Sequence, residues 1–178
     1  MSALQPEYAA RITEFFTELG IPSDYPARRH LQLQPEAVEL VSVGFNATGG
    51  DCLLLPGAAD AWQTMRARAQ VYGIDLIPLS GFRGVDRQAE IIRGKLALGE
   101  ALEEVLGTMA APGFSEHHTG RAIDIGTSGV PPLEEAFATT PAYAWLARHS
   151  GHFGFRLSYP RHNRHGFIYE PWHWFWQG

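Results

Sequence analysis

The chain has 178 residues, a formal net charge of −5 and a sequence pI of about 5.9. Hydrophobic residues make up 45% and charged residues 19%, which is typical of one compact globular domain. The acidic balance argues against a nucleic-acid-binding protein, because such proteins generally present a basic surface. No apolar run reaches the roughly 20 residues that a membrane span needs. The N-terminus also lacks the basic start and apolar stretch of a signal peptide, so we expect a soluble domain and leave its compartment open between cytoplasm and cell envelope.

The first half of the chain predicts a helix, a hairpin and a second helix. The apolar spacing of residues 8–19 favours an amphipathic helix that stops at Gly20. Two apolar or alternating runs flank the turn signal at residues 46–50, which predicts a β-hairpin. In chain order we expect a helix at 8–19, a loop at 21–29, strands at 38–45 and 51–55, and a helix at 58–71. Cys52, the one cysteine, precedes an apolar run and is predicted to be a small core residue.

The second half of the chain is richer in predicted strands. In chain order we expect a strand at 74–79, helices at 87–98 and 100–109, a strand at 121–125, a helix at 141–150, and strands at 155–158, 167–169 and 172–176. The alternation of the last strand places Trp172, Trp174 and Trp176 on one face, where we expect them to be core residues. Helices first and strands later favour an α+β domain with a central, mostly antiparallel sheet and flanking helices.

Three clusters of polar residues could carry chemistry. The first runs from Ser115 to Asp124, where a turn at Gly120 would bring His117 and Asp124 face to face. The second is Glu170-Pro-Trp-His173, close to the C-terminus. The third is Ser80-Gly-Phe-Arg83, directly after a predicted strand.

These residue types suit a catalytic zinc site. Two neutral imidazoles and one carboxylate, here His117, Asp124 and His173, hold the ion and leave a fourth position for water, whose pKa the metal lowers. Glu170 would be the base that takes the water proton, and Arg83 would bind a substrate carboxylate or the developing oxyanion. The helical His-Glu-x-x-His pattern of many metalloproteases is absent from the sequence.

At these residues the sequence resembles the VanY-type D-alanyl-D-alanine carboxypeptidases. Ser115-x-His117-x-x-Gly-x-Ala-x-Asp124, followed about fifty residues later by Glu170-x-Trp-His173, resembles the paired zinc motifs of that family. The wider group includes D-Ala-D-Ala dipeptidases, lysostaphin-like endopeptidases and the Hedgehog signalling domain. The resemblance covers residues 55–178, which we expect to form the catalytic domain. Residues 1–54 would form an N-terminal extension of one helix and one hairpin that packs on this core.

The resemblance implies a role for each matching residue. It implies that His117, Asp124 and His173 bind Zn²⁺ and that Glu170 is the general base and later the proton donor to the leaving amine. Arg83 would stabilise the oxyanion or anchor the substrate, while Ser115 and Gln88 would contact the substrate. Gly84 departs from the family pattern, in which Ser is common at this position. His118 follows a ligand, and in a strand it would point away from the metal, which favours a surface or supporting role.

The resemblance implies cleavage of the terminal D-Ala-D-Ala bond of a peptidoglycan stem peptide or muropeptide. An L,D- or D,D-endopeptidase or a small cell-wall lysin on the same scaffold is the alternative enzyme. A zinc-stabilised binding module without turnover is the alternative from another class. Glu170 favours an enzyme, because a silent module needs no base beside its metal.

Overall fold

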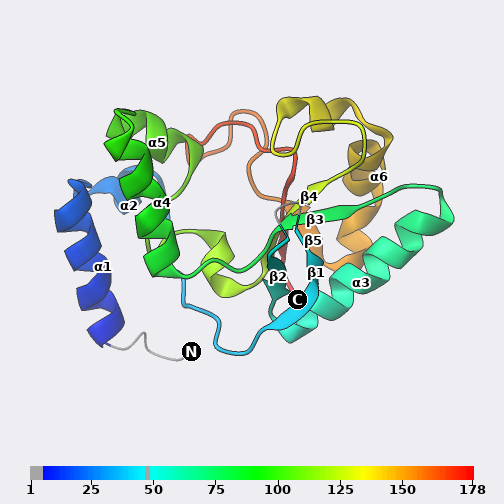
Figure 1. Ribbon diagram of the computed structural model, residues 1–178, viewed down its shortest axis with the longest axis horizontal. Helices are drawn as coiled ribbons and strands as arrows, with labels where there is room; N and C mark the ends of the chain where they lie inside the picture. Colours follow the sequence, from blue (N-terminus) through cyan, green and yellow to red (C-terminus); the bar gives the residue numbers. More distant parts are fainter. Residues whose placement is uncertain (1–5, 47–48) are drawn as a thin grey trace.

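A four-stranded antiparallel sheet with strand order β3-β4-β6-β5 lies at the centre of the molecule (Figure 1). The structure is a computed structural model that describes residues 6–46 and 49–178. A separate antiparallel pair, β1-β2, forms the hairpin. The strands are β1 (Val41–Phe45), β2 (Asp51–Leu54), β3 (Ile77–Ser80), β4 (Ala122–Gly126), β5 (Phe155–Leu157) and β6 (His173–Trp176). This arrangement confirms the expected α+β fold class with antiparallel pairing.

Helices flank the sheet on two sides (Figure 1). The helices α3 and α6 pack on one side with the strands, around a core that contains Trp62, Phe155 and Trp174. The helices α1, α2, α4 and α5 form a second apolar cluster on the other side, around Tyr25 and Ile92. The helices are α1 (Pro6–Leu19), α2 (Tyr25–Arg28), α3 (Pro56–Val71), α4 (Val85–Ala97), α5 (Leu102–Thr108) and α6 (Pro141–His149), with 3₁₀ helices η1 (Glu116–Thr119), η2 (Glu135–Thr139) and η3 (Ser150–Phe153).

Most expected elements are present, with ends that shift by one to three residues. The expected hairpin is confirmed, although residues 47–48 of its turn lie outside the described part of the chain. The buried Cys52 is confirmed as a core residue, and Trp172, Trp174 and Trp176 join the same apolar cluster. Ala122–Gly126 is buried at every position, as expected for a strand with neighbours on both edges.

Two sequence predictions of secondary structure are wrong. The expected loop at 21–29 contains the short helix α2, which begins with a proline in its first turn. The expected strand at 167–169 is a loop. There Phe167 turns inward against Tyr159, with ring centroids 5.0 Å apart, while Ile168 remains 46% exposed. The Ile168 N–H donates to the Gly107 carbonyl at 3.1 Å, so the segment attaches to the end of α5 instead of to a strand.

The segment before the hairpin contacts the loop that leads into η1. Gln34 N donates to the Gly113 carbonyl at 2.7 Å, and Ala37 N donates to the His118 carbonyl at 2.8 Å. Glu36 Oε1 accepts from Val85 N at 2.6 Å, which caps α4 where Gly84 supplies no side chain. The proposed boundary at residue 54 stays a prediction, but these contacts give residues 34–37 a place beside the segments that line the cavity described below.

No helix in residues 6–46 and 49–178 has the length and apolarity that a bilayer crossing requires.

Candidate active site

A tight turn brings His117 and Asp124 together. Ser115 caps η1, its Oγ accepting from His117 N at 3.3 Å, and Gly120 ends η1 with φ +64°. A side chain at Gly120 would be strained at this φ, and its Cβ would lie 2.9 Å from Leu55 N, so glycine is required. After this turn the chain enters β4, and His117 Nε2 lies 3.3 Å from Asp124 Oδ2.

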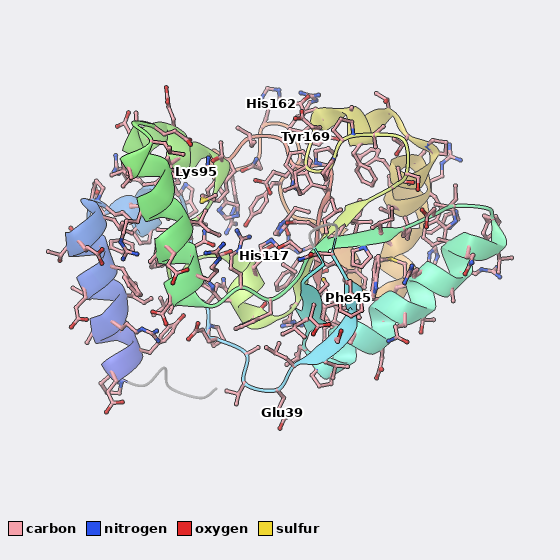
Figure 2. All side chains as sticks on the ribbon, in the orientation of Figure 1. Glu39, Phe45, Lys95, His117, His162 and Tyr169 are labelled. Carbon is pink, nitrogen blue, oxygen red and sulfur yellow. The ribbon has the colours of Figure 1, made fainter. Side chains whose placement is uncertain are left out.

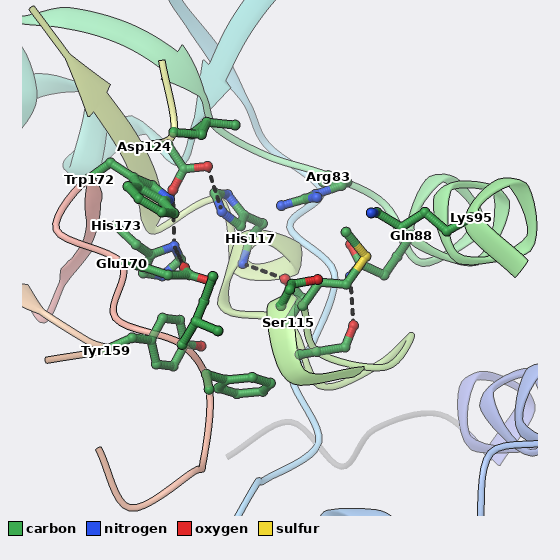
Figure 3. Close-up of a pocket in the computed structure, with 16 residues that line it drawn as sticks. Arg83, Gln88, Lys95, Ser115, His117, Asp124, Tyr159, Glu170, Trp172 and His173 are labelled. Atoms are coloured by element: carbon green, nitrogen blue, oxygen red, sulfur yellow. Dashed lines mark hydrogen bonds and ion pairs between the residues drawn. The ribbon is translucent and has the colours of Figure 1, made fainter. Parts of the chain in front are cut away.

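His173 reaches the same point from β6. It is the direct partner of Asp124 in the pairing of β4 with β6, and its Nδ1 lies 3.1 Å from Asp124 Oδ1. One ligand atom from each of His117, Asp124 and His173 lies within 4.8 Å of the other two, and all three side chains are buried. The structure therefore brings together the trio that the sequence analysis selected (Figure 3).

Hydrogen bonds on the far side of each imidazole fix which nitrogen faces the centre of the trio. His117 Nδ1 donates to the Gly81 carbonyl at 2.7 Å, which leaves Nε2 toward Asp124. His173 Nε2 lies 2.9 Å from Glu116 Oε2, which leaves Nδ1 toward Asp124. Two imidazole nitrogens and a carboxylate oxygen converge with their outer atoms already held, and this donor set fits a divalent transition metal.

The charges of the trio depend on one another. Burial opposes ionisation of Asp124, but His117 and His173 hold the pKa of its carboxyl well below the usual range. Burial lowers the pKa of His117. Burial also disfavours a charged His173, yet hydrogen bonds to Asp124 and Glu116 raise its pKa to about 10. In the metal-free protein His173 therefore carries a proton that a bound cation would displace, while Asp124 is already the anion that such a cation needs.

Glu170 stands next to the trio but outside it. It begins the turn that leads into β6, and its Oε2 lies 3.8 Å from His173 Nδ1. Burial raises the pKa of its carboxyl to about 7, against the opposing effect of His173. A carboxyl group with a pKa near neutrality can both accept and return a proton, which is the property of a general base.

Arg83 faces the trio from the loop after β3. It lines a cavity of about 340 Å³ together with His117, Asp124, Glu170 and His173 (Figure 3). Burial lowers its pKa, and its Nε is buried without a hydrogen-bond partner in the described part of the chain. No ion pair joins its guanidinium to an acidic residue within 6–46 and 49–178.

Ser115 and Gln88 line the same cavity. The Ser115 Oγ accepts from His117 N, so its own proton is available to a ligand. Gln88 is fully buried in α4, and its Nε2 donates to the Ala110 carbonyl at 2.6 Å. Its Oε1 has no partner among the described residues. Both positions are compatible with substrate contact, which stays a prediction.

Three residues of the site escaped the sequence analysis. Tyr159 lines the cavity, with its ring 4.7 Å from that of His173, and Lys95 lines it from α4. Glu116 holds His173 from behind. The spacing of Gln88 and Lys95, seven residues apart on one helix, was an available signal that both share one face. Figure 2 shows His117 near the middle of the molecule and Lys95 on the α4 side.

His118 does not have the surface role that was one of its two alternatives. It lies in η1 instead of a strand and is completely buried. Its Nδ1 donates to the Arg83 carbonyl at 2.6 Å, and its Nε2 accepts from Gly113 N at 3.0 Å. His118 therefore ties the Arg83 loop to the loop before η1, which is a supporting role.

Comparison with known proteins identifies the family of this chain. The family model of VanY, described as D-alanyl-D-alanine carboxypeptidase, matches residues 52–178. The chain belongs to the VanY family. A D-alanyl-D-alanine carboxypeptidase of Enterococcus faecalis (strain ATCC 700802 / V583) is 32% identical over 133 residues, 69% of this chain and 46% of the relative. The carboxypeptidase-named protein YodJ of Bacillus subtilis (strain 168) is 38% identical over 120 residues. The match covers 65% of this chain and 43% of the length of YodJ.

Solved structures of VanY-like proteins share the fold. The LD-carboxypeptidase LdcB superposes with a TM-score of 0.73 at 32% identity, covering 80% of this chain and 70% of LdcB. VanYB in complex with D-alanine-D-alanine superposes with a TM-score of 0.62 at 28% identity, covering 89% of this chain and 81% of VanYB. A mutant of the D,D-pentapeptidase VanY in complex with Zn(II) superposes with a TM-score of 0.63 at 27% identity, covering 85% of this chain and 88% of that VanY. This VanY-family chain spans less than half the length of the curated relatives named above.

Proposed function

We propose that this VanY-family chain is a zinc-dependent carboxypeptidase that removes the terminal D-alanine from peptidoglycan stem peptides or muropeptides ending in D-Ala-D-Ala. The observation that carries the proposal is the convergence on one cavity of a buried His-Asp-His trio, the adjacent buried carboxyl of Glu170 and a guanidinium without an ion-pair partner in the described chain. The zinc complex of one solved VanY and the D-alanine-D-alanine complex of VanYB support the choice of metal and substrate.

His117 Nε2, an Asp124 oxygen and His173 Nδ1 would hold the ion. A bound zinc ion would supply Lewis acidity to the scissile carbonyl and lower the pKa of a water molecule. The protein's contribution begins with orientation, because the Gly81 carbonyl and the Glu116 carboxylate fix the two rings before metal or substrate arrives.

Glu170 and Arg83 would divide the remaining chemistry. Glu170 takes the proton of the attacking water and returns it to the amine of the leaving D-alanine, so that the amine departs uncharged. Arg83, whose guanidinium forms no ion pair with residues 6–46 and 49–178, offers it either to the oxyanion that develops at the carbonyl or to the free carboxylate of the C-terminal residue. Burial of a cation is costly, and an anionic substrate group would offset part of that cost.

Ser115 and Gln88 would position the peptide. The Ser115 hydroxyl is free to donate, and the Gln88 amide oxygen is free to accept, so the pair suits the C=O and N–H of one substrate peptide unit. Both roles are subordinate to those of the trio, Glu170 and Arg83.

A second candidate is an L,D-carboxypeptidase, which would remove D-alanine from the tetrapeptide stem. The superposition on LdcB at a TM-score of 0.73 and 32% identity favours this candidate. The two candidates share every chemical role named above, and they differ in the stereochemistry of the residue before the scissile bond.

A matched pair of stem peptides tests the proposal and separates the two candidates. Zinc-loaded protein is incubated with a pentapeptide ending in D-Ala-D-Ala and with the tetrapeptide that lacks the last D-alanine, and kcat/KM is measured for each. A preference for the pentapeptide supports the proposal, and a preference for the tetrapeptide supports the second candidate. Cleavage only of cross-linked stems would indicate an endopeptidase. Turnover of no stem by fully zinc-loaded protein would contradict the enzyme and favour a binding module.

A further inference from the structure

Glu116 lies at the junction of three segments behind the candidate metal site. It is the first residue of η1, adjacent to His117, and its side chain is only 14% exposed. Its carboxylate has three partners. Ser158 Oγ donates to Oε2 at 2.5 Å, His173 Nε2 lies 2.9 Å from the same oxygen, and Arg156 Nη2 donates to Oε1 at 3.1 Å.

This contact decides which nitrogen of His173 is available. A neutral imidazole, the form that binds a metal, presents its lone pair at Nδ1 when it donates a hydrogen bond from Nε2. Nδ1 is the nitrogen that points to Asp124 Oδ1, at 3.1 Å. His117 shows the opposite arrangement, since its Nδ1 donates to the Gly81 carbonyl and its Nε2 faces Asp124. The two rings therefore turn different nitrogens inward, and only that of His173 is held by a charged acceptor.

We propose that Glu116 is a positioning residue, which accepts the Nε2–H of His173 and thereby sets the ring orientation and the tautomer that make Nδ1 the metal ligand. Ser158 holds the Oε2 oxygen that faces His173, whereas Arg156 binds the other oxygen, Oε1. The carboxylate also increases the basicity of the ring, which strengthens the bond to a metal. This inference rests on the proposed function, because it concerns the affinity of the proposed zinc site.

Glu116 has a simpler alternative role as an ion pair that fastens η1 to β5 through Arg156. The two roles use different oxygens of the carboxylate, Oε2 for His173 and Oε1 for Arg156. They can therefore be separated by two variants. Glu116→Gln keeps the length of the side chain but removes the charge that faces His173. Arg156→Gln removes the ion pair and leaves the carboxylate, Ser158 and His173 unchanged.

The decisive readout is zinc affinity, measured by competition with a fluorescent chelator. We expect Glu116→Gln to weaken zinc binding by about 10- to 100-fold. Arg156→Gln should change it by no more than about 3-fold, because the exposed ion pair contributes little. Thermal unfolding of the metal-free variants reports any loss of fold. Equal zinc affinity of Glu116→Gln and wild type, or an equal loss in Arg156→Gln, would overturn the inference.

A spectroscopic readout tests the tautomer directly. In two-bond ¹H–¹⁵N spectra of the zinc-loaded wild type, we expect a proton on Nε2 of His173 and on Nδ1 of His117. A proton on Nδ1 of His173 would contradict the inference even if zinc is bound. Wild-type protein that binds no zinc would contradict the proposed function as a whole, whereas normal wild-type binding with an unaffected Glu116→Gln variant would contradict this inference alone.

Discussion

Asp124 and His173 are direct partners across β4 and β6, and their side chains meet at 3.1 Å between Oδ1 and Nδ1. On its other edge Asp124 pairs with Ser80, the last residue of β3, from which the loop to Arg83 starts. The sheet thus places the two proposed ligands Asp124 and His173 side by side, next to the strand end from which the loop to Arg83 starts. Because the two strands are central, little of this geometry depends on mobile segments.

Substitution of the proposed base tests the division of labour between Glu170 and the trio. We expect Glu170→Gln to lower kcat/KM for the preferred stem peptide by at least about 100-fold, since the amide cannot take a proton. Zinc stoichiometry, measured by elemental mass spectrometry, should remain that of the wild type. Glu104→Gln, on the exposed face of α5, is the control and should retain activity. Full activity of Glu170→Gln would remove Glu170 from the mechanism.

Arg83 should be irreplaceable even by lysine. Its guanidinium lies in the cavity and forms no ion pair within residues 6–46 and 49–178. A planar guanidinium can donate two parallel hydrogen bonds to a carboxylate, which the ammonium group of lysine cannot do. We expect Arg83→Ala and Arg83→Lys each to lower kcat/KM by about 100-fold or more, with zinc affinity unchanged. Arg87→Ala removes an exposed arginine of α4 that pairs with Glu90, and it should behave as wild type. Restoration of activity by lysine would show that charge alone suffices.

Gly81 should tolerate no side chain. A Cβ at this position would lie 2.3 Å from the Leu53 carbonyl oxygen and 3.0 Å from Cys52 Sγ. We expect Gly81→Ala to lower the free energy of unfolding by about 1–3 kcal/mol, because backbone must move to admit the methyl group. The same shift would displace the carbonyl that holds His117. Gly94→Ala is the matched control, since its Cβ meets nothing within 4 Å and alanine favours the helix, so it should be neutral or stabilising. Urea unfolding of both variants decides the point.

Cys52 should make stability fall at alkaline pH. Burial raises the pKa of its thiol from 9.0 to about 12, and the nearby Asp124 adds to the effect. Since the folded state holds the proton more tightly, this stabilisation is complete below pH 9 and is lost as pH rises toward 12. We expect the unfolding free energy to fall with a slope of up to about 1.4 kcal/mol per pH unit in this window. Cys52→Ala should show a shallower slope in parallel urea titrations, and identical slopes would contradict the assignment.

The sequence predicted which residues would meet at the candidate site because their paired motifs resemble those of a known family and their residue types suit a metal. His117, Asp124, Glu170 and His173 were selected from motifs and from what a metal requires, and the structure brings all four to one cavity. The turn at Gly120 was also predictable from the sequence, because a turn with positive φ favours glycine. The roles of these four residues in catalysis stay predictions.

What escaped the sequence depends on contacts between distant segments. Glu116 meets its partners 40 to 57 residues away, through a strand register that no local pattern specifies. The segment 167–169 has the apolar composition of a strand, but Phe167 packs on Tyr159 and the Ile168 N–H donates to the Gly107 carbonyl, contacts that the local sequence does not reveal. Similarly, no local sequence pattern predicted that the distant Glu36 would cap the N-terminus of α4, where Gly84 has no side chain.

The central claim, a metal-dependent peptidase, is tested most directly by mass spectrometry of a stem pentapeptide ending in D-Ala-D-Ala after incubation with the zinc-loaded protein. We predict the loss of one alanine, its abolition by a chelator, and its return when zinc is added back. A pentapeptide and a tetrapeptide that both remain intact with zinc-loaded, folded protein would contradict the account. Cleavage that persists after complete removal of the metal would contradict it equally.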